Sequence, residues 1–298
     1  MRQIRLKAYG KLNLGLDVIG RRENGYHDLA MVMQTVKLYD TITLRILDEF
    51  PSEDGIRLTC SVPELPVDES NIVYKAIRLM RKEYGIKEGI KGEIIKHIPM
   101  AAGMAGGSAD AACTLIAMNY LFRLGADREK LCDLGVKLGA DVPFCVMRGT
   151  MLCEGIGEKL THITPPPHCH ILIAKPSFGV STKDVYEAVD SLKTPYHPDI
   201  RALCKALDKG DIKEIAKYCG NTLERVTVEK HSEIEKIEAV MRDGGAVLSM
   251  MTGSGPTVFG LFEDRMTARK VGKMLRSGRA GIQIEQVALT EFYQPKGR

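Results

Sequence analysis

The chain has 298 residues, 44% of them hydrophobic and 27% charged, and a formal net charge of +4. This composition is ordinary for a soluble globular protein, and the length allows one large or two ordinary domains. No segment has the apolar length needed to span a bilayer, which excludes a membrane protein. The mild positive charge does not require a nucleic-acid partner, although it suits an anionic substrate.

The eight cysteines are scattered and include no C-x-x-C pair. Several fall on apolar faces of the expected elements, which indicates reduced, buried thiols and disfavours a metal site. The first residues alternate charged and apolar side chains and lack the apolar run of a signal peptide. We therefore expect a cytoplasmic protein.

The N-terminal stretch predicts strands. Residues 2–9 alternate as a strand does, and residues 11–18 alternate again, so that Lys11 and Asn13 share one face. A lysine on a strand is ordinarily a solvated charge, and position alone favours that interpretation for Lys11.

A turn and a long β-prone segment come next. Asn24-Gly25 is a hairpin signal, and the Tyr26-His27 pair that follows is either strand surface or a pair that reads a base. Residues 31–46 predict two strands that meet near Tyr39-Asp40.

The middle of the chain predicts a loop that becomes a helix. Residues 70–84 form an amphipathic pattern that Ser70 can cap, and residues 89–98 predict a strand. That strand leads into a run of small residues, 99–112, which continues without a break into the apolar-periodic segment 113–122.

The glycines of residues 99–112 let a ligand approach the main chain, and the unpaired amides of the following helix favour an anion such as phosphate. The run has neither the Walker A pattern nor the dinucleotide-binding spacing. It is therefore a phosphate loop of another kind, or small residues that only pack a loop on a sheet. Ser108 is a candidate N-cap whose hydroxyl could instead face a phosphate or Mg²⁺, and Asp110 in the first turn suits the helix dipole.

Residues 127–139 predict another helix, which ends at Gly139. Asp141 directly follows that end, where the partial negative charge of the last carbonyls disfavours a carboxylate. Either a cationic partner or ligand compensates, or Asp141 caps an Asx turn.

Pro165-Pro166-Pro167 marks the best domain boundary, because it can form neither a helix nor a central strand, and we divide the chain into residues 1–160 and 161–298. The second part alternates strands and helices without a long parallel run, which predicts an α+β fold in two layers. Its expected elements are strands at 170–175, 246–251, 257–262 and 282–292, a glycine-rich turn at 252–256, and helices that begin at Ser181, fill 198–228, begin at Ser232 and cover 264–277.

Five blocks of the sequence resemble, in order, the signatures of the GHMP small-molecule kinases. The second and fourth blocks resemble more narrowly the 4-diphosphocytidyl-2-C-methyl-D-erythritol kinases. The resemblance implies a two-domain GHMP kinase fold of the α+β class, with an N-terminal ATP-binding and catalytic domain that is ribosomal-protein-S5-domain-2-like and a C-terminal substrate-binding domain that is ferredoxin-like. The blocks are residues 8–14, 24–27, 99–112, 139–144 and 251–256.

The resemblance implies ATP-dependent phosphorylation of the 2-hydroxyl of 4-diphosphocytidyl-2-C-methyl-D-erythritol, a step of the non-mevalonate isoprenoid pathway. Lys11 would lie near the acceptor hydroxyl and the γ-phosphate and stabilise the transferring group. Asp141 would pair with Lys11 and either accept the hydroxyl proton or mainly orient Lys11 and the hydroxyl.

ATP and Mg²⁺ are the cofactors that the resemblance implies. The loop amides from Gly103 to Ser108 would hold the ATP phosphates, Ser108 would lie near Mg²⁺, and Lys96 would lie near the adenine. The expected ATP-binding residues are Lys96, Pro99, Met100, Ala101, Ala102, Gly103, Met104, Ala105, Gly106, Gly107, Ser108 and Ala109.

For the other substrate, Tyr26 resembles the ring that stacks on cytosine and His27 the group that reads the edge of the base. Tyr186 would close the stack, and Asn13 would touch the methylerythritol unit or its phosphate. The resemblance implies no nucleic-acid or membrane partner, and a monomer or weak homodimer. The second glycine turn adds the substrate-binding residues Gly253, Ser254 and Gly255.

The phosphate loop departs from the family pattern G-L-G-G-G-S-S-N. Met104 replaces leucine conservatively, whereas Ala105 lacks the conformational freedom of glycine. Ala109 removes a second hydroxyl and rules out a Mg²⁺ contact there. These changes concern the phosphate geometry more than the activity.

Two other interpretations stay open. Another GHMP kinase, acting on mevalonate, phosphomevalonate or homoserine, would need no cytosine reader, and a Tyr26-His27 pair buried away from the pocket would favour it. A catalytically silent GHMP-fold binding protein would need no carboxylate beside a lysine. The presence of both Lys11 and Asp141 therefore favours an enzyme.

Overall fold

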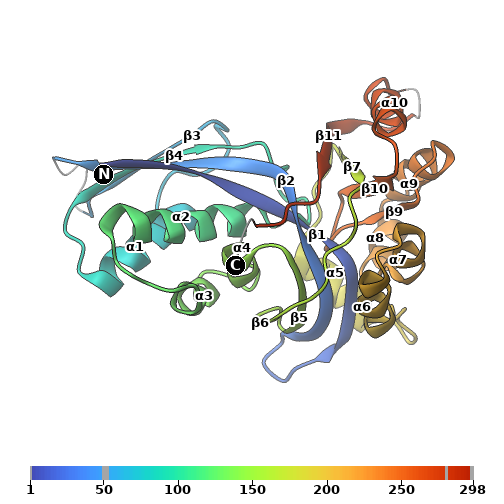
Figure 1. Cartoon of the computed structure of the whole chain (residues 1–298), viewed down its shortest axis with the longest axis horizontal. Helices are drawn as coiled ribbons and strands as arrows, with labels where there is room; N and C mark the ends of the chain where they lie inside the picture. Colours follow the sequence, from blue (N-terminus) through green and yellow to red (C-terminus); the bar gives the residue numbers. More distant parts are fainter. Residues whose placement is uncertain (1, 49–53, 279–280, 296–298) are drawn as a thin grey trace. The chain divides into compact units, whose positions relative to one another are not determined.

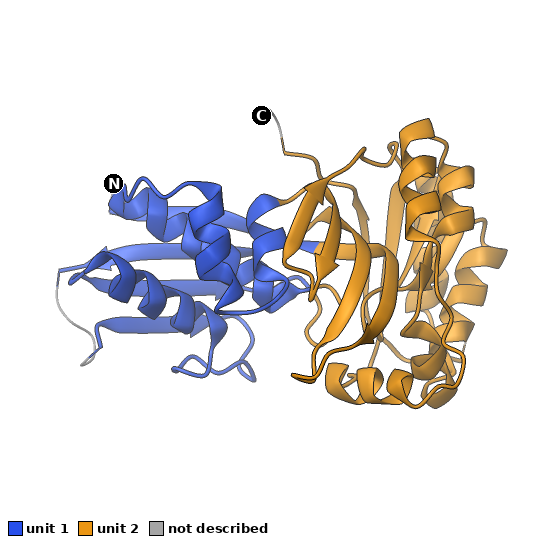
Figure 2. Ribbon diagram, turned by 90° about the horizontal axis from the view of Figure 1, so that it is seen from below, with its two compact units in different colours: residues 1–10, 39–98, 105–147 blue, residues 11–38, 99–104, 148–298 orange. Residues whose placement is uncertain are grey.

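The computed structural model describes residues 2–48, 54–278 and 281–295. The chain divides into two compact units that are each discontinuous in sequence (Figure 2). Unit 1 comprises residues 1–10, 39–98 and 105–147, and unit 2 comprises residues 11–38, 99–104 and 148–298. Both units combine sheets with helices, as expected for the α+β class.

Two long neighbouring strands, β1 (Gln3–Arg21) and β2 (His27–Leu47), run through both units. The break expected near Tyr39-Asp40 is wrong, because β2 is one strand of 21 residues. Asp40 is fully buried in it and accepts hydrogen bonds from the backbone amides of His97 and Ile98, at 2.5 and 2.8 Å. These distant partners satisfy a polar side chain that looked like a turn residue in the sequence.

In unit 1, the second half of β2 pairs antiparallel with β4 (Gly89–Ile95), and β3 (Ile56–Cys60) pairs parallel with β4. Four helices that contact one another lie on one face of these strands (Figure 1). They are α1 (Ile72–Tyr84), α2 (Gly106–Phe122), α3 (Arg128–Val136) and α4 (Val142–Met147).

Helix α1 buries the apolar face that its periodicity predicts, but Ser70 is not its cap. Asn71 occupies the N-cap, and its side chain accepts a hydrogen bond from the Val73 amide at 2.8 Å. The Ser70 hydroxyl instead donates to the side chain of Asp68, two residues earlier. Either residue type suits this position, so composition alone could not choose between them.

In unit 2, the first half of β2 pairs antiparallel with β5 (Thr150–Gly155), which pairs with β6 (Lys159–His162). The short strand β8 (Gly220–Asn221) pairs parallel with β1. Four further helices of unit 2 lie between β7 (His170–Pro176) and α9 (Glu233–Asp243) in the chain: α5 (Thr182–Asp190), α6 (Ile200–Lys209), α7 (Ile212–Tyr218) and α8 (Glu224–Lys230).

The second sheet of unit 2 confirms the ferredoxin-like expectation. Its strands lie in the order β11-β7-β10-β9, all neighbours are antiparallel, and two helices pack on it in a β-α-β-β-α-β sequence. Its core includes Phe259 and Phe262, and burying one such side chain contributes about 1.5–3 kcal/mol. The elements are β7 (His170–Pro176), α9 (Glu233–Asp243), β9 (Leu248–Met251), β10 (Val258–Phe262), α10 (Arg265–Arg276) and β11 (Ile284–Glu291).

None of the eight cysteines, all within the described residues, forms a disulfide, and four of them are buried and four half-buried. Within the described residues, every helix is too short or too polar to cross a membrane.

Candidate functional site

Lys11 on β1 is a buried lysine, not the solvated charge that its position favoured. Its residue is 4% exposed, and Nζ donates to the side-chain Oδ1 of Asn13 at 2.5 Å. Within the described residues of unit 2, the ammonium makes no ion pair. A buried ammonium is costly unless a negative charge lies beside it, and an anionic ligand would offset that cost.

Asn13 is held so that its carbonyl faces Lys11. Its own side-chain Nδ2 lies 3.5 Å from the sulfur of Met31, and its backbone amide donates to the Thr252 hydroxyl at 3.0 Å. The residue is fully buried. Asn13 therefore orients Lys11 from one side and ties β1 to the second glycine turn on the other.

The two glycine segments of unit 2 touch each other through their backbones. Gly103 has φ +68°, and a Cβ atom there would lie 2.1 Å from the carbonyl oxygen of Thr252. Conversely, a Cβ on Gly253 would lie 2.8 Å from the carbonyl oxygen of Gly103. The Met104 carbonyl accepts from the Lys11 amide at 3.1 Å. Lys11, the loop 99–104 and the turn 252–256 thus form one junction, which requires glycine at both contacts.

Side chains that no motif singled out support this turn. Asn221 donates both side-chain hydrogens, to the carbonyls of Met251 at 3.1 Å and Gly253 at 2.8 Å. Glu224 accepts from the Met251 amide at 2.6 Å, and the hydroxyls of Ser254 and Thr182 are 2.9 Å apart. Sequence analysis missed Asn221 and Glu224 because their partners lie about 30 residues further along the chain.

His27 contacts a carboxylate and an aromatic ring within unit 2. Its Nε2 is 2.7 Å from Oδ1 of Asp190, and its ring centroid is 4.8 Å from that of Tyr186. Tyr26 is 58% exposed. Asp190 was missed, although it lies four residues after Tyr186 on α5 and so shares that helix face.

In unit 1, the helix that follows the loop begins without a side-chain cap, so the assignment of Ser108 as N-cap is wrong. The N-cap is Ala105, in the left-handed conformation with φ 54°, and the first helical bond runs from the Ala109 amide to the Ala105 carbonyl at 2.8 Å. The amides of Gly106, Gly107 and Ser108 come before that bond and point out of the helix end. These are the groups that a phosphate anion requires.

Asp141 also lies in unit 1. The expectation that a helix end disfavours its carboxylate is wrong. It immediately precedes α4, and its carbonyl accepts from the Cys145 amide at 3.1 Å. The start of a helix favours a carboxylate. Its neighbourhood is still informative, because a Cβ on Gly139, two residues earlier, would lie 3.9 Å from the Ser108 hydroxyl.

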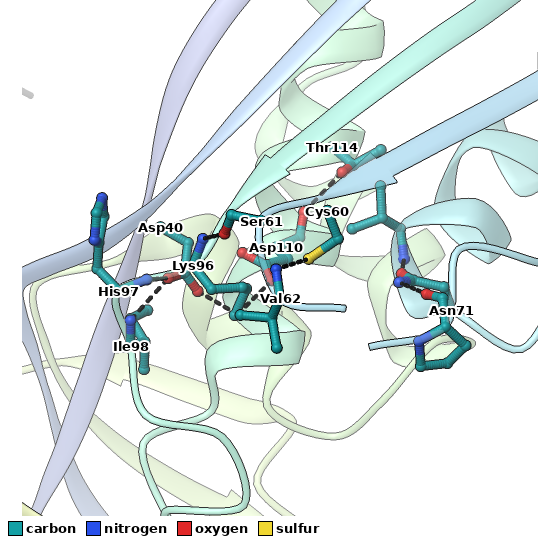
Figure 3. A network of polar contacts seen from close by, with 12 residues as sticks. Asp40, Cys60, Ser61, Val62, Asn71, Lys96, His97, Ile98, Asp110 and Thr114 are labelled. Carbon is teal, nitrogen blue, oxygen red and sulfur yellow. Dashed lines mark hydrogen bonds and ion pairs between the residues drawn. The ribbon is translucent and has the colours of Figure 1, made fainter. Parts of the chain in front are cut away.

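Lys96 does not present a free ammonium (Figure 3). It lies between Asp40 and Asp110, bonded to Oδ2 of each, and its side chain is 6% exposed. Asp110 is therefore an ion-pair partner and not a first-turn residue that only suits the dipole. Burial raises the pKa of Asp110 to about 7, while for Lys96 the lowering by burial is outweighed by both carboxylates, which raise its pKa.

A further group, His168, His170 and Glu291 in unit 2, offers three metal-ligating atoms within 4.8 Å of one another. In the sequence, metal ligands were sought among the cysteines, and this group contains none. Lys37 donates to the other Glu291 oxygen at 2.7 Å, and this ion pair, with burial opposing, lowers the pKa of Glu291. The carboxylate is thus already neutralised by a cation.

The expected site residues fall in both units. Unit 1 contains Lys96, Ala105–Ala109 and Asp141, and unit 2 contains Lys11, Asn13, the loop 99–104 and the residues expected to contact the base and the second turn. The pairing of Lys11 with Asp141 stays a prediction.

Comparison with protein families agrees with this fold. The GHMP kinases N terminal domain matches residues 71–149, and the GHMP kinases C terminal domain matches residues 203–279, together more than half of the chain. The two matches lie on either side of the Pro165–Pro167 segment, and the division at residues 160 and 161 stays a prediction. The chain is thus a GHMP kinase, an ATP-dependent small-molecule kinase.

Individual relatives narrow the class. A 4-diphosphocytidyl-2-C-methyl-D-erythritol kinase of Lachnospira eligens is 52% identical over 99% of this chain and 100% of its own, and one of Caldicellulosiruptor bescii is 43% identical with the same coverage. A crystal structure of 4-(cytidine 5'-diphospho)-2C-methyl-D-erythritol kinase superposes with a TM-score of 0.81 at 28% identity, covering 98% of this chain and 100% of that one. The chain belongs to the 4-diphosphocytidyl-2-C-methyl-D-erythritol kinase family.

The fold extends to kinases with other names. A homoserine kinase of Cytophaga hutchinsonii superposes with a TM-score of 0.79 at 21% identity, covering 97% of this chain and 95% of that one. At this identity the likeness shows the fold alone, so the acceptor must be argued from the site.

Proposed function

We propose that the chain transfers the γ-phosphoryl group of ATP to the 2-hydroxyl of 4-diphosphocytidyl-2-C-methyl-D-erythritol, in the non-mevalonate isoprenoid pathway of the cytoplasm. The observation that carries the choice of acceptor is the contact of His27 with Asp190 and Tyr186. An oriented imidazole beside an aromatic ring suits a pyrimidine base. Mevalonate and homoserine have no base to read.

The chemistry assigned to the residues follows from where charge develops. Lys11, buried and bonded to an amide, stabilises the transferring phosphoryl group. Asp141 accepts the hydroxyl proton or orients the hydroxyl. Asn13, which accepts a hydrogen bond from Lys11, would contact the methylerythritol unit or its phosphate.

ATP is held mainly by backbone. The outward amides of Gly106, Gly107 and Ser108 would bind phosphate oxygens. Gly107 is exposed, and among the described atoms a Cβ there would lie no nearer than 3.7 Å, from Ile72, which leaves room for a ligand at this residue. Mg²⁺ would neutralise phosphate charge, and the half-buried Ser108 hydroxyl is the group on this turn that would lie near it.

The test is an ADP-release assay of the full chain with three acceptors: the cytidyl substrate, mevalonate and homoserine. We expect kcat/KM for the cytidyl substrate to exceed that for either other alcohol by about 10⁴ or more, because a site built for a polar group rejects ligands that lack it. Equal or higher kcat/KM for mevalonate or homoserine would contradict the proposal. Nucleotide binding without release of ADP in the presence of any of the three acceptors would indicate a binding protein.

A further inference from the structure

Three charged side chains form a nearly dry cluster in unit 1 (Figure 3). Lys96 Nζ bonds to Oδ2 of Asp40 and, at 2.7 Å, to Oδ2 of Asp110. The side chains of Lys96, Asp40 and Asp110 are 6%, 0% and 3% exposed. Placing an ammonium and two carboxyl groups away from water is costly unless they are paired. The contacts of the three side chains show which parts of the chain they join.

One end of the cluster holds the chain just before the glycine loop. Oδ1 of Asp40 accepts from the amides of His97 and Ile98, the last two residues before the segment 99–104. The Lys96 amide itself donates to the Ser61 hydroxyl at 3.0 Å. The main chain entering the loop is thus bonded at three consecutive residues.

The other end holds the helix just after the loop. Asp110 belongs to α2, and its carbonyl also accepts from the Thr114 hydroxyl at 2.8 Å. A Cβ on Gly106 would lie 3.4 Å from Lys96 Nζ and 3.2 Å from Ile98 Cγ2, so the ammonium packs against the first residue of α2. The same lysine therefore contacts the anchor before the loop and the helix after it.

We propose that Lys96 is a positioning residue for the phosphate loop: by joining Asp40 to Asp110 it sets the spacing between Ile98 and the start of α2. The amides of Gly106, Gly107 and Ser108 are thereby held where the ATP phosphates bind. This inference rests on the proposed function, because it assumes that these amides hold a nucleotide. It differs from the expected contact of Lys96 with adenine, because two carboxylates already bond to the ammonium.

The test compares Lys96→Met with the wild type by calorimetric binding of ADP and by steady-state kinetics. We expect the Kd for ADP and the KM for ATP to rise about tenfold or more, because small displacements of binding groups are costly. KM for the cytidyl substrate should stay within about twofold and kcat within about threefold, since an interaction made equally in ground and transition states affects KM.

A second pair of variants isolates the bond to Asp110. Asp110→Asn retains an acceptor for Lys96 and should bind ADP within about threefold of the wild type, whereas Asp110→Leu has no acceptor and should bind about tenfold more weakly. Glu285→Gln, a carboxylate-to-amide change beside the buried Lys175 of unit 2, is the matched control and should leave ADP binding unchanged. Thermal unfolding checks that each variant is folded.

The proposal is overturned if Lys96→Met binds ADP like the wild type, if it raises both KM values equally, or if Asp110→Leu and Asp110→Asn bind ADP alike. The last comparison decides the matter should Lys96→Met fail to fold. Failure of the proposed function has a different signature: the wild type would bind ADP but would not phosphorylate the cytidyl substrate.

Discussion

Asp190 is the side chain that gives His27 a defined orientation. Its carboxylate lies 2.7 Å from His27 Nε2 and 3.3 Å from the guanidinium of Arg21, and its side chain is 23% exposed. A histidine that reads a base must present one ring nitrogen as a donor or acceptor, and the partner of the other nitrogen determines which. We therefore assign Asp190 to positioning His27.

His27→Ala should raise KM for the cytidyl substrate about tenfold or more, because one buried hydrogen bond of about 1–3 kcal/mol is lost. KM for ATP should be unchanged, since His27 is not assigned to the nucleotide. Asp190→Asn should give a smaller change in the same direction. Steady-state kinetics with each substrate varied in turn measure both effects.

His197→Ala is the matched control, because His197 is also bonded to an aspartate, Asp17, at 2.7 Å. It should leave both KM values near those of the wild type. Equal losses for ATP and the cytidyl substrate in His27→Ala would count against a base-reading role.

At the scale of the elements, α2 begins under local strain. Ala105 has φ 54°, a conformation that costs a residue with a Cβ about 1–2 kcal/mol relative to the right-handed helix. Ala109, four residues later, lies inside the helix and is buried. The same substitution should therefore have opposite effects at these two positions.

Ala105→Gly should raise the free energy of unfolding by about 0.5–1 kcal/mol, because glycine adopts positive φ without a steric penalty. Ala109→Gly should lower it by about 1 kcal/mol or more, since glycine is unfavourable within a helix. Urea denaturation of the two variants and the wild type measures the difference. A destabilised Ala105→Gly would show that the alanine is not strained there.

Two carboxyl groups interact near the second glycine turn: Glu224, which accepts from the Met251 amide, and the buried Glu238. Burial, and then the proximity of Glu238, raises the pKa of Glu224 to about 8. Burial likewise raises the pKa of Glu238 to about 7, although its bond to Arg242 at 3.3 Å acts in the other direction, and Glu235 adds to the increase. Oε1 of Glu238 is buried without a hydrogen-bond partner.

These raised pKa values predict how stability varies with pH. The folded state keeps protons that the unfolded chain releases near 4.5, so the free energy of unfolding should fall as the pH rises through 7 to 8. Glu238→Gln removes one titrating group and should flatten that fall. Urea midpoints measured between about pH 6 and pH 9 test this. An equally steep decline in the variant would be evidence that Glu238 does not contribute to it.

For the whole molecule, the strand alternation and the order of elements predicted an α+β fold, and the resemblance to the GHMP kinases added the ferredoxin-like part. The errors have two causes. Either the hydrogen-bond partner of a residue lies far along the chain, or the element is very short. Asp40 looked like a turn because its partners lie 57 and 58 residues away. Asp141 was placed after a helix that ends at Gly139, whereas it precedes the short helix α4, whose first turn tolerates Pro143.

The candidate site was predicted best where the chemistry is local to a motif. The backbone contact of Gly103 with Thr252 and Gly253 explains why two separate glycine motifs occur. The supporting side chains Asn221 and Asp190 lie outside every motif, and no motif indicated the ion pairs of Lys96 with Asp40 and Asp110. A motif shows where a ligand group can bind, but the side chains that hold it come from distant parts of the chain.

The central claim is that Lys11 and Asp141 act together on one hydroxyl group. The most direct test is the single-turnover rate at saturating substrates for Lys11→Met, Asp141→Asn and the double variant, with Asp133→Asn, an exposed change on α3, as control. We expect each single change to lower the rate by about 10²–10⁴, and the double variant to be within about tenfold of the slower single, because residues that act as a unit are not additive. Full activity in either single variant, or losses that multiply in the double variant, would contradict the account.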